Sequence, residues 1–592
     1  MQQWKSGNSR IIQSTVVVLL LLLLLLRNTP AQAQVVFSAN AESWYQRYSH
    51  YPPQCSTTEQ MKNRTIPPLT TAAHGESRLQ HVTVIMRHGA RTPVHNASCW
   101  EGYGAEPWTC PPSTYLAADR ATDGELLTFE QVYDALQFPQ YNLSNFLPGT
   151  CQIGQLLEQG MQQQLTNGLH LRRAYLEESS PKNLHLPLGG SLDKAVYFRS
   201  DDEQRTLQSG QLLLQAMLGN ELEKTGGLII HTADYTRDIV GDHDALCPRL
   251  AEFRERFYRT REFRIFNESD DANELRQFQQ EVLGSTGDIS DCLLTTICSD
   301  RELHPKINDY EGDENSENSM FSRLLRFYVQ QKSMLATFDF AEYSKLVSGP
   351  LRAEIMENIQ TFVESGGETY VPPFALFSGH DTTIMAILAS MDMFDEQWPT
   401  YASMLVIEIH EINLDGRKDP ALYTSDFGFR MVYDGKVITD QMKGCPSGQE
   451  ICDTTKLLEA MYYDVKTRNC ERLYAIPVEF TPAVTQATAI LVSSRSAFGG
   501  FLLLVSFGMA LGGLLTYLYF AHWVPLSLQR KVGAPGRAEM DGIMVEEPVC
   551  YGGDADEGQR RNGHIALPTD DSENFTIDDE DVDFVTPNTQ LT

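Results

Sequence analysis

The sequence has little cysteine, little positive charge and few long apolar runs. Cysteine accounts for 11 of 592 residues, too few for a fold held together mainly by disulfides, and 47 Lys and Arg face 78 Asp and Glu. The formal net charge of −31 opposes contact with phosphate backbones, so we expect no nucleic-acid partner. The chain also lacks H-E-x-x-H and zinc-type Cys/His spacings, and we therefore expect no metal and no cofactor.

The first apolar run, Val16–Leu26, lies near the N-terminus and ends at Arg27. It is about half of the roughly 20 residues that cross a bilayer. Positive charge precedes it, and Ala31-Gln32-Ala33 follows as an A-x-A cleavage pattern. We therefore expect residues 1–33 to be a secretory signal peptide and the mature chain to start at Gln34.

The second run, Phe498–Phe520, contains no charged residue and is long enough for a transmembrane helix. Residues 475–497 resemble a stalk, and residues 521–592 form an acidic tail that we expect to be disordered and cytoplasmic. This predicts a single-pass type I membrane protein at the cell surface or in endosomal or lysosomal membranes. Gly508 and Gly512 match the G-x-x-x-G spacing of paired membrane helices, so a homodimer is one expectation, although glycine-rich spans often contain that spacing.

The most informative stretch of the remaining sequence is His81–Pro93. Residues 81–86 alternate β-branched and apolar positions and predict a buried strand. Gly89 then permits a tight turn or a close backbone approach, and Pro93 disfavours a helix through that point. Charged side chains thus follow the carboxyl end of a core strand, which is where open α/β sheets bind ligands.

The charged residues at this strand end suit phosphate chemistry. Arg87 and Arg91 carry planar forks of donors that match phosphate oxygens in pairs. His88 lies between them, and a neutral imidazole beside a neutralised phosphate can attack phosphorus. An arbitrary Arg-His pair would more often be a surface loop, so the length of the motif matters here.

Three separated motifs resemble those of the histidine acid phosphatases. Arg87–Pro93 matches the R-H-G-x-R-x-P signature, residues 197–201 resemble the strand-end arginine segment, and Phe377–Thr383 resembles the late His-Asp segment. The resemblance spans roughly residues 80–470 and, with the expected anchor, is to a membrane-bound acid phosphatase. It implies an α/β fold of the phosphoglycerate mutase-like type, with a mixed sheet, flanking helices and an inserted helical cap.

The resemblance also implies residue roles. His88 would be the nucleophile and Asp381 the proton donor, while Arg87, Arg91, Arg199 and His380 would bind phosphate. The substrates would be small phosphomonoesters. Because a carboxylic acid donor is protonated only at low pH, we expect maximal activity at roughly pH 4–6. The opposing interpretation of Asp381 is a cap on the helix that begins at Thr382.

The domain that carries these motifs is expected to span residues 34–474, with its cap at about 234–366. Lys194–Phe198 predicts a second strand, and Ser200 and Glu203 fit a capping box that would place Arg199 at a helix N-terminus. A helical pattern begins at Ile153, and residues 405–409 and 429–433 resemble edge strands of a mixed sheet.

Surface and disulfide expectations follow from a secreted domain. Four N-x-S/T sites could carry glycans, namely Asn63, Asn96, Asn142 and Asn267. Cys247 with Cys470 resembles a family link. Cys445 with Cys452, and Cys292 with Cys298, are expected to pair locally, although connectivity does not follow from sequence alone.

Three alternatives to a broad acid phosphatase stay open at this stage. A phytase and a lysophosphatidate phosphatase share the chemistry, and residues of the cap would decide among them. A non-catalytic surface receptor that keeps the fold is a different class of protein. Loss of His88 or Asp381 would favour the receptor, and both residues are present.

Overall fold

A computed structural model of the protein describes residues 44–462 apart from short gaps, the longest being 118–127, 131–144, 220–227 and 309–317. The expected signal peptide, stalk, membrane helix and tail lie outside the described residues, as do Asn96, Asn142 and Cys470. Within the described part of the chain, no helix is both long and apolar enough to cross a membrane.

The core is a mixed β-sheet with the strand order β10-β8-β7-β1-β6-β4-β5, and β9 pairs with β8. Strands β1, β6, β4 and β5 are parallel, and β7, β8 and β10 are antiparallel to their neighbours. The sheet strands are β1 Arg78–Arg87, β4 Val196–Ser200, β5 Ile230–His231, β6 Phe374–Gly379, β7 Met404–Glu411, β8 Phe427–Tyr433, β9 Lys436–Val437 and β10 Cys452–Asp453. A separate pair joins β2 Thr114–Ala117 to β3 Thr128–Glu130.

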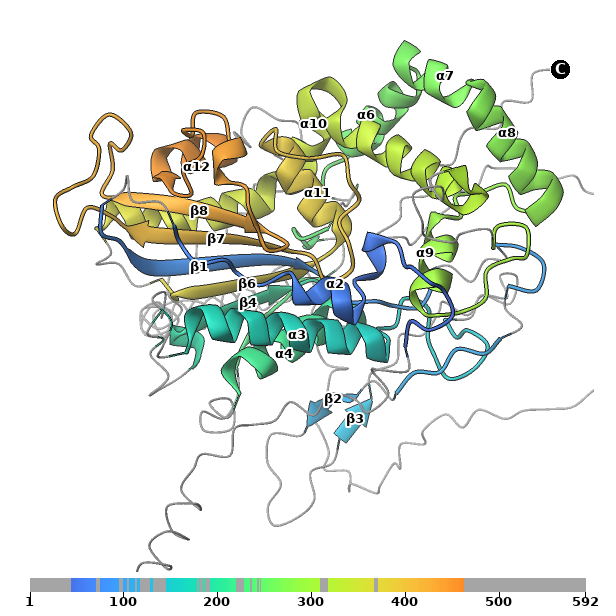
Figure 1. Ribbon diagram of the computed structural model, residues 1–592, viewed down its shortest axis with the longest axis horizontal. Helices are drawn as coiled ribbons and strands as arrows, with labels where there is room; N and C mark the ends of the chain where they lie inside the picture. The colour runs from blue at the N-terminus through green and yellow to red at the C-terminus, as the bar shows by residue number, and fades with distance from the viewer. Residues whose placement is uncertain are drawn as a thin grey trace, which may run out of the picture. The chain divides into compact units, whose positions relative to one another are not determined.

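Helices cover both faces of the sheet (Figure 1). The helices are α2 Thr58–Lys62, α3 Glu158–Tyr175, α4 Gln204–Leu218, α6 Arg249–Tyr258, α7 Arg261–Asn267, α8 Asp270–Phe278, α9 Ser290–Cys298, α10 Met320–Glu364, α11 Asp381–Ser390 and α12 Thr454–Met461. Helices α3 and α4 lie on one face, and α11, α12 and the second half of α10 lie on the other. The expected α/β architecture with a mixed sheet and flanking helices is confirmed.

Strand β1 is the central strand and is apolar on both faces, as its sequence predicted. Val82, Val84 and Met86 pack with the core of α3 and α4, whereas Ile85 packs with the core of α10 and α11. Burial of both faces fixes the strand's register, so the loop after Arg87 leaves the sheet at one defined point.

Strands β7 and β8 are interior strands, and the expectation of edge strands was wrong. Strand β7 lies between β1 and β8, and nearly all residues of both strands are buried. Their polar positions face the protein interior: Glu408 pairs with Arg430 at 3.3 Å, and both side chains are fully buried. A buried ion pair therefore produced the alternation that an exposed face would also produce.

The cap consists of α6 to α9 and the first half of α10. Helix α10 is interrupted at Phe338–Ala341, where Asp339, Phe340 and Ala341 have positive φ. Its first half packs with α8 and α9, and its second half packs on the sheet through Leu351 and Ile355. The single long helix thus connects the cap to the core.

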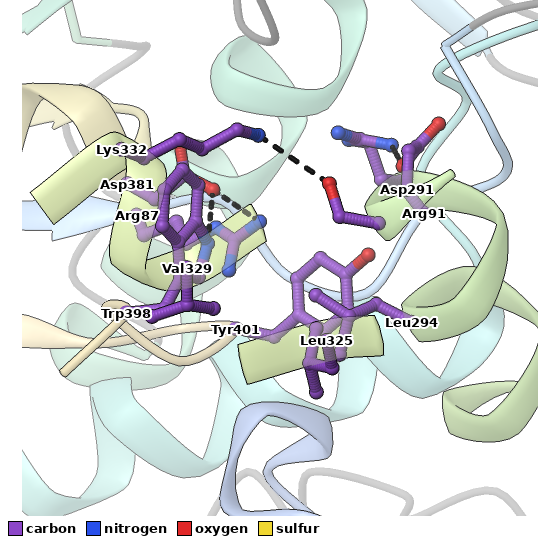
Figure 2. A pocket seen from close by; sticks show the side chains of 11 residues that line it. Arg87, Arg91, Asp291, Leu294, Leu325, Val329, Lys332, Asp381, Trp398 and Tyr401 are labelled. Carbon is purple, nitrogen blue, oxygen red and sulfur yellow. Dashed lines mark hydrogen bonds and ion pairs between the residues drawn. The ribbon is translucent and has the colours of Figure 1, made fainter. Parts of the chain in front are cut away.

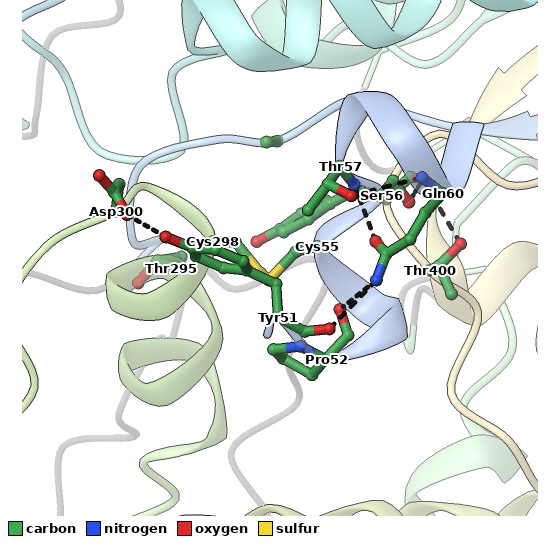
Figure 3. Close-up of a disulfide and its surroundings, with 12 residues drawn as sticks. Tyr51, Pro52, Cys55, Ser56, Thr57, Gln60, Thr295, Cys298, Asp300 and Thr400 are labelled. Carbon is green, nitrogen blue, oxygen red and sulfur yellow. Dashed lines mark hydrogen bonds between the residues drawn. A yellow bond between two sulfur atoms is a disulfide. The ribbon is translucent and has the colours of Figure 1, made fainter. Parts of the chain in front are cut away.

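Two disulfides fasten α9 to segments that precede and follow β1. Cys55 pairs with Cys298 (Figure 3), and Cys99 pairs with Cys292. The expected Cys292–Cys298 pair was wrong for a geometric reason. Six helical residues separate the two α-carbons by about 9 Å along the axis, beyond the reach of a disulfide.

The other described cysteines are also bonded. Cys445 pairs with Cys452, and Cys110 with Cys151. Cys247 is disulfide-bonded, and its expected partner Cys470 lies outside the described residues, so that pairing stays a prediction.

Candidate active site

The loop after β1 is held by backbone hydrogen bonds from several elements. His88 N donates to Gly379 O at 2.9 Å, Ala402 N donates to His88 O at 3.0 Å, and Leu157 N donates to Ala90 O at 2.9 Å. Side chains of α3 and α4 complete the set, because Ala90 N donates to Gln163 and Gly89 N donates to Ser209. The loop is therefore rigid before any ligand binds.

Gly89 is required by a close backbone approach. A β-carbon at Gly89 would lie 2.3 Å from Gly160 O, and one at Gly160 would lie 2.2 Å from Ala90 O. The loop thus packs backbone against backbone on the first turn of α3, which begins at Glu158 instead of near Ile153. Of the two reasons that the sequence offered for Gly89, the close approach is the one that the structure shows.

His88 is fully buried and has one ring nitrogen committed to the backbone. Nδ1 lies 2.7 Å from Gly89 O, and because a carbonyl only accepts, Nδ1 is the donor and Nε2 carries the lone pair. Burial holds the pKa of His88 well below its usual range, and Arg87, Arg205 and Arg91 lower this pKa further. The imidazole therefore stays neutral and nucleophilic even in acid.

Asp381 and Arg87 form a buried ion pair at the start of α11. Arg87 Nη2 lies 2.6 Å from Asp381 Oδ2, and Arg87 Nη1 donates to Pro399 O at 2.8 Å. Two more donors reach the carboxylate: Trp398 Nε1 donates to Oδ2 at 2.9 Å (Figure 2), and Thr382 N donates to Oδ1 at 2.8 Å. The helix begins at Asp381 and its N-cap is His380, so the expectation of Asp381 as the cap of a helix beginning at Thr382 was wrong. One oxygen of Asp381 accepts from the Thr382 amide within the first turn, and the other faces the pocket.

Arg91 is positioned by the cap. Arg91 Nη1 donates to Asp291 Oδ1 at 2.7 Å, and the second oxygen of Asp291 accepts from Val94 N at 2.9 Å. Asp291 lies on α9, the helix that two disulfides fasten to the N-terminal segments. The cap thus contributes directly to the geometry of the arginine loop, which no sequence motif indicated.

Arg205, which the sequence analysis missed, is the third arginine near His88. Helix α4 begins at Gln204, and Glu203 is its N-cap without a side-chain capping bond, so the expected capping box of Ser200 and Glu203 was wrong. Arg205 therefore lies in the first turn, where its guanidinium pairs with Glu203 and lies near Gly154. It lowers the pKa of both His88 and His380, which places its charge beside both rings.

Arg199 lies elsewhere, near the end of β4. Its guanidinium lies 3.8 Å from Asp238 Oδ2 and 4.0 Å from Glu354 Oε2. The structure brings together five of the six predicted site residues, Arg87, His88, Arg91, His380 and Asp381, and it directs Arg199 to a different pair of carboxylates. A usable sequence signal for Arg205 was its place in the first turn of an amphipathic helix, where the helix dipole favours anions.

His380 is the second histidine of the site. Its ring lies 5.8 Å from that of His88, and Nε2 is hydrogen-bonded to Asp201 Oδ2. Burial, followed by the charge of Arg205, holds the pKa of His380 well below its usual range. Among the described residues, no group of His, Cys, Asp and Glu is arranged to hold a metal ion.

A pocket opens between this loop and the cap (Figure 2). Its polar lining residues are Arg87, Arg91, Ser290, Asp291, Lys332 and Asp381, and its apolar ones are Leu294, Leu325, Val329, Trp398 and Tyr401. Lys332 of α10 lies 4.4 Å from the centre of the Trp398 ring and 3.6 Å from Asp288. Two arginine–carboxylate pairs, Arg87 with Asp381 and Arg91 with Asp291, therefore line the pocket together with an apolar wall.

Two of the four expected glycan sites can be placed. Asn63 is exposed at the end of α2. Asn267 ends α7 and is half-buried, and its amide oxygen accepts a hydrogen bond from Arg276 at 2.8 Å. Of the two, Asn63 presents the more accessible surface for a glycan.

A neutral histidine among arginines, at the carboxyl end of parallel strands, defines a hydrolase of the histidine phosphatase type. Residues 78–434 match the Histidine phosphatase superfamily (branch 2), which is more than half of the chain, so the protein belongs to that superfamily. Similar proteins include a probable acid phosphatase of Schizosaccharomyces pombe, 27% identical over 353 residues that cover 56% of this chain and 73% of that protein.

Two further relatives come from Homo sapiens. Lysophosphatidic acid phosphatase type 6 is 24% identical over 416 residues, covering 67% of this chain and 86% of that protein. Lysosomal acid phosphatase is 23% identical over 397 residues, covering 64% and 77%. Among solved structures, the phytase from D. castellii is 13% identical, with a TM-score of 0.43 and coverage of 73% of this chain and 91% of that one.

Proposed function

We propose that this protein is an acid phosphatase that hydrolyses phosphate monoesters through a phosphohistidine intermediate on His88. The observation that carries the proposal is the state of His88: it is buried and neutral, Nδ1 is committed to Gly89 O, and three arginines lie close to it. Nε2 therefore carries the lone pair, close to where phosphate charge would be neutralised.

The first half of the proposed reaction forms the intermediate. The substrate phosphate binds among Arg87, Arg91 and Arg205, and Nε2 of His88 attacks phosphorus in line with the leaving oxygen. A nitrogen–phosphorus bond forms as the phosphorus–oxygen bond breaks, and Asp381 gives its proton to the leaving alkoxide. In the second half, water attacks the phosphohistidine, Asp381 takes the proton from that water, and inorganic phosphate leaves.

Asp381 must be released from Arg87 to play this role. In the unliganded site its pocket-facing oxygen accepts from Arg87 and Trp398 together. A bound phosphate competes for Arg87 and adds negative charge, and both effects favour protonation of Asp381. We therefore expect protonation to follow substrate binding, with maximal activity at roughly pH 4–6.

The pocket wall supports a leaving group with an apolar part. Leu294, Leu325 and Val329 come from the cap, and Trp398 and Tyr401 face them from the core. A relative is named as a lysophosphatidic acid phosphatase, and a similar structure is titled as a phytase. The lining favours an aryl or acyl phosphomonoester over an inositol polyphosphate, and kcat/KM for nitrophenyl phosphate, lysophosphatidate and phytate would rank the three classes.

We also propose the membrane topology that the sequence predicts. The span at 498–520 and the signal at 1–33 support a type I protein with its catalytic domain outside the cytosol, at the cell surface or in endolysosomal membranes. Protease added to sealed vesicles should remove the acidic tail and spare a glycosylated catalytic domain. Protection of the tail would reverse the orientation.

The decisive test of the enzyme is trapping of the intermediate. During turnover of a labelled phosphomonoester at acid pH, with chelator present, a quench without acid should trap phosphate on His88, identified by mass spectrometry. His88→Ala should lose at least about 10³-fold in kcat and all labelling, because no other nucleophile replaces the imidazole. A labelled His88→Ala protein would refute the assignment, and an inactive wild type would refute the enzyme.

A further inference from the structure

His380 contacts a carboxyl group to which the sequence analysis assigned no role. Asp201 lies at the end of β4, next to Ser200, and its side chain is 8% exposed. One oxygen is hydrogen-bonded to His380 Nε2, and the other accepts from the hydroxyl of Thr206 in the first turn of α4. Both oxygens are thus committed, one of them to a histidine that the sequence analysis expects to bind phosphate.

We propose that Asp201 is a positioning residue that sets His380 as a hydrogen-bond donor to the substrate phosphate in acid and withdraws this donor near neutrality. The inference rests on the proposed function, because it assigns His380 to a bound phosphate. His380 has two ring nitrogens, and Nε2 faces Asp201. Nδ1 is the other ring nitrogen, and we assign it the contact with a phosphate held at His88.

The number of protons shared by Asp201 and His380 determines whether Nδ1 of His380 is a hydrogen-bond donor or an acceptor. When Asp201 is a carboxylic acid and His380 is neutral, the acid donates to Nε2, and the ring proton must then be on Nδ1, where it can be given to a phosphate oxygen. When the pair loses one proton, Nε2–H donates to the carboxylate and Nδ1 carries a lone pair. A lone pair directed at an anionic phosphate repels it.

The surroundings support protonation of Asp201 in acid. Burial raises the pKa of Asp201 to about 6, and the charge of Asp202 adds to the increase, while Thr206 and Arg205 oppose it. The charged and titratable groups around His380 are Arg205, Glu203, His88 and Asp381, and burial keeps its imidazole neutral. Both conditions of the donating state are therefore met at acid pH.

A second buried carboxyl group lies close by. Asp238 is 1% exposed, feels the charge of Asp201, and has a pKa raised to about 7 by burial first and by Asp201 next. Arg199 lies 3.8 Å from it. The same segment supports the His380 backbone, since His380 N donates to Thr383 Oγ1, which donates to Val240 O. Arg199 thus balances the charge of this carboxyl pair.

The test is Asp201→Asn, which preserves the acidic arrangement at every pH. An asparagine amide can donate to His380 Nε2 through its NH₂ group and accept from Thr206 through its oxygen, which replicates the protonated carboxyl group. The matched control is Asp202→Asn, which removes the same charge from the adjacent, exposed residue. The assay is kcat/KM of the full-length chain for nitrophenyl phosphate from pH 4.5 to 7.5.

The readout is kcat/KM of the variant divided by kcat/KM of the wild type at each pH. Titration of the substrate affects both enzymes equally and cancels in this ratio. For Asp201→Asn we expect a ratio near one at pH 5 that rises to about 30 at pH 7.5, since about one part in 30 of a group with a pKa of about 6 stays protonated there. Asp202→Asn removes a charge that raises the pKa of Asp201, so its ratio should stay near one in acid and fall modestly toward pH 7.5, opposite in direction to that of Asp201→Asn. Asp201→Ala should lose at least about tenfold at pH 5 with unchanged thermal unfolding.

Two results would overturn the inference in distinguishable ways. A flat or falling Asp201→Asn ratio in an active enzyme would refute the role of Asp201 and leave the proposed phosphatase intact. A wild type that hydrolyses no phosphomonoester at any pH would refute the proposed function, and the role of Asp201 with it.

Discussion

Arg205 and Arg199 lie six residues apart, and their substitution is expected to have different effects. Arg205→Ala should lower the catalytic rate, whereas Arg199→Ala should lower the stability of the fold. Arg205→Ala should remove one guanidinium beside both histidines. Loss of one preorganised donor to a developing negative charge costs about 10²–10³ in kcat, equivalent to about 2.7–4 kcal/mol of transition-state stabilisation. We expect a loss in that range. Because the Glu203 oxygen left behind is buried, some loss of thermal stability should accompany it, and kcat is therefore compared per folded molecule.

The pH dependence of that loss has a definite sign. Arg205 lowers the pKa of His88, so its removal lets this pKa rise and a larger fraction of the nucleophile is protonated in acid. The deficit of Arg205→Ala should therefore be larger at pH 4 than at pH 6.5. Arg205→Lys retains the charge without the fork, and should give a smaller loss with less dependence on pH.

Arg199→Ala should act on stability instead of rate. The folded-state pKa of Asp238 is raised above its ordinary value, so this group favours the folded state in acid, and that contribution is lost as pH rises toward about 7. Without Arg199 the ionised form is costlier still, so the loss of unfolding free energy should be greater at pH 8 than at pH 5. Steady-state kinetics and urea unfolding on the same samples test both statements. A kcat that falls more in Arg199→Ala than in Arg205→Ala, at equal stability, would refute the assignment.

Three other predictions concern the surroundings of the site. Trp398→Phe keeps the ring but removes the donor to Asp381, and should lower kcat about tenfold for alkyl phosphates and less for nitrophenyl phosphate, whose leaving group needs little proton donation. Burial lowers the pKa of His81 to about 4, so as the pH falls this histidine binds a proton in the unfolded chain before it does in the folded protein, and acid destabilises the fold. His81→Gln should therefore reduce the loss of unfolding free energy between pH 6.5 and 4 by up to about 3 kcal/mol, measured by urea titration. Replacing Cys55 and Cys298 by serine should lower activity and stability through α9 and Arg91, whereas the same change at Cys445 and Cys452 should leave kcat unchanged.

The sequence was most informative where function and local structure coincide. The strand before Arg87 has to be apolar on both faces, and the residues after it are contiguous, so one stretch defines β1, its loop and three site residues. The same holds for His380 and Asp381, which follow directly on the buried strand β6. Contacts between residues that are neighbours in the chain can be predicted without knowing how the cap folds.

Predictions failed where one residue of offset or a distant partner decides the result. Helix α4 begins at Gln204, and this start moves Arg205 into the site and leaves Arg199 on the strand. Asp291 and Trp398 contact Arg91 and Asp381 from segments that carry no motif. The disulfides of Cys292 and Cys298 cross 193 and 243 residues, and only the folded cap brings those partners together.

The charges around His88 explain why such a site would favour acid beyond the need for a protonated donor. Arg87 and Arg91 each form an ion pair with a carboxylate. Each guanidinium can therefore bind a second anion only when its carboxylate gives up that contact. Burial raises the pKa of Asp201 to about 6 and of Asp238 to about 7, and both groups lose their negative charge as the pH falls. His88 and His380 stay neutral over the same range because burial opposes their protonation. The pocket therefore becomes more positive in acid without protonating the nucleophile, and affinity for inorganic phosphate should rise from pH 7.5 to pH 5 in wild type and less in Asp201→Asn.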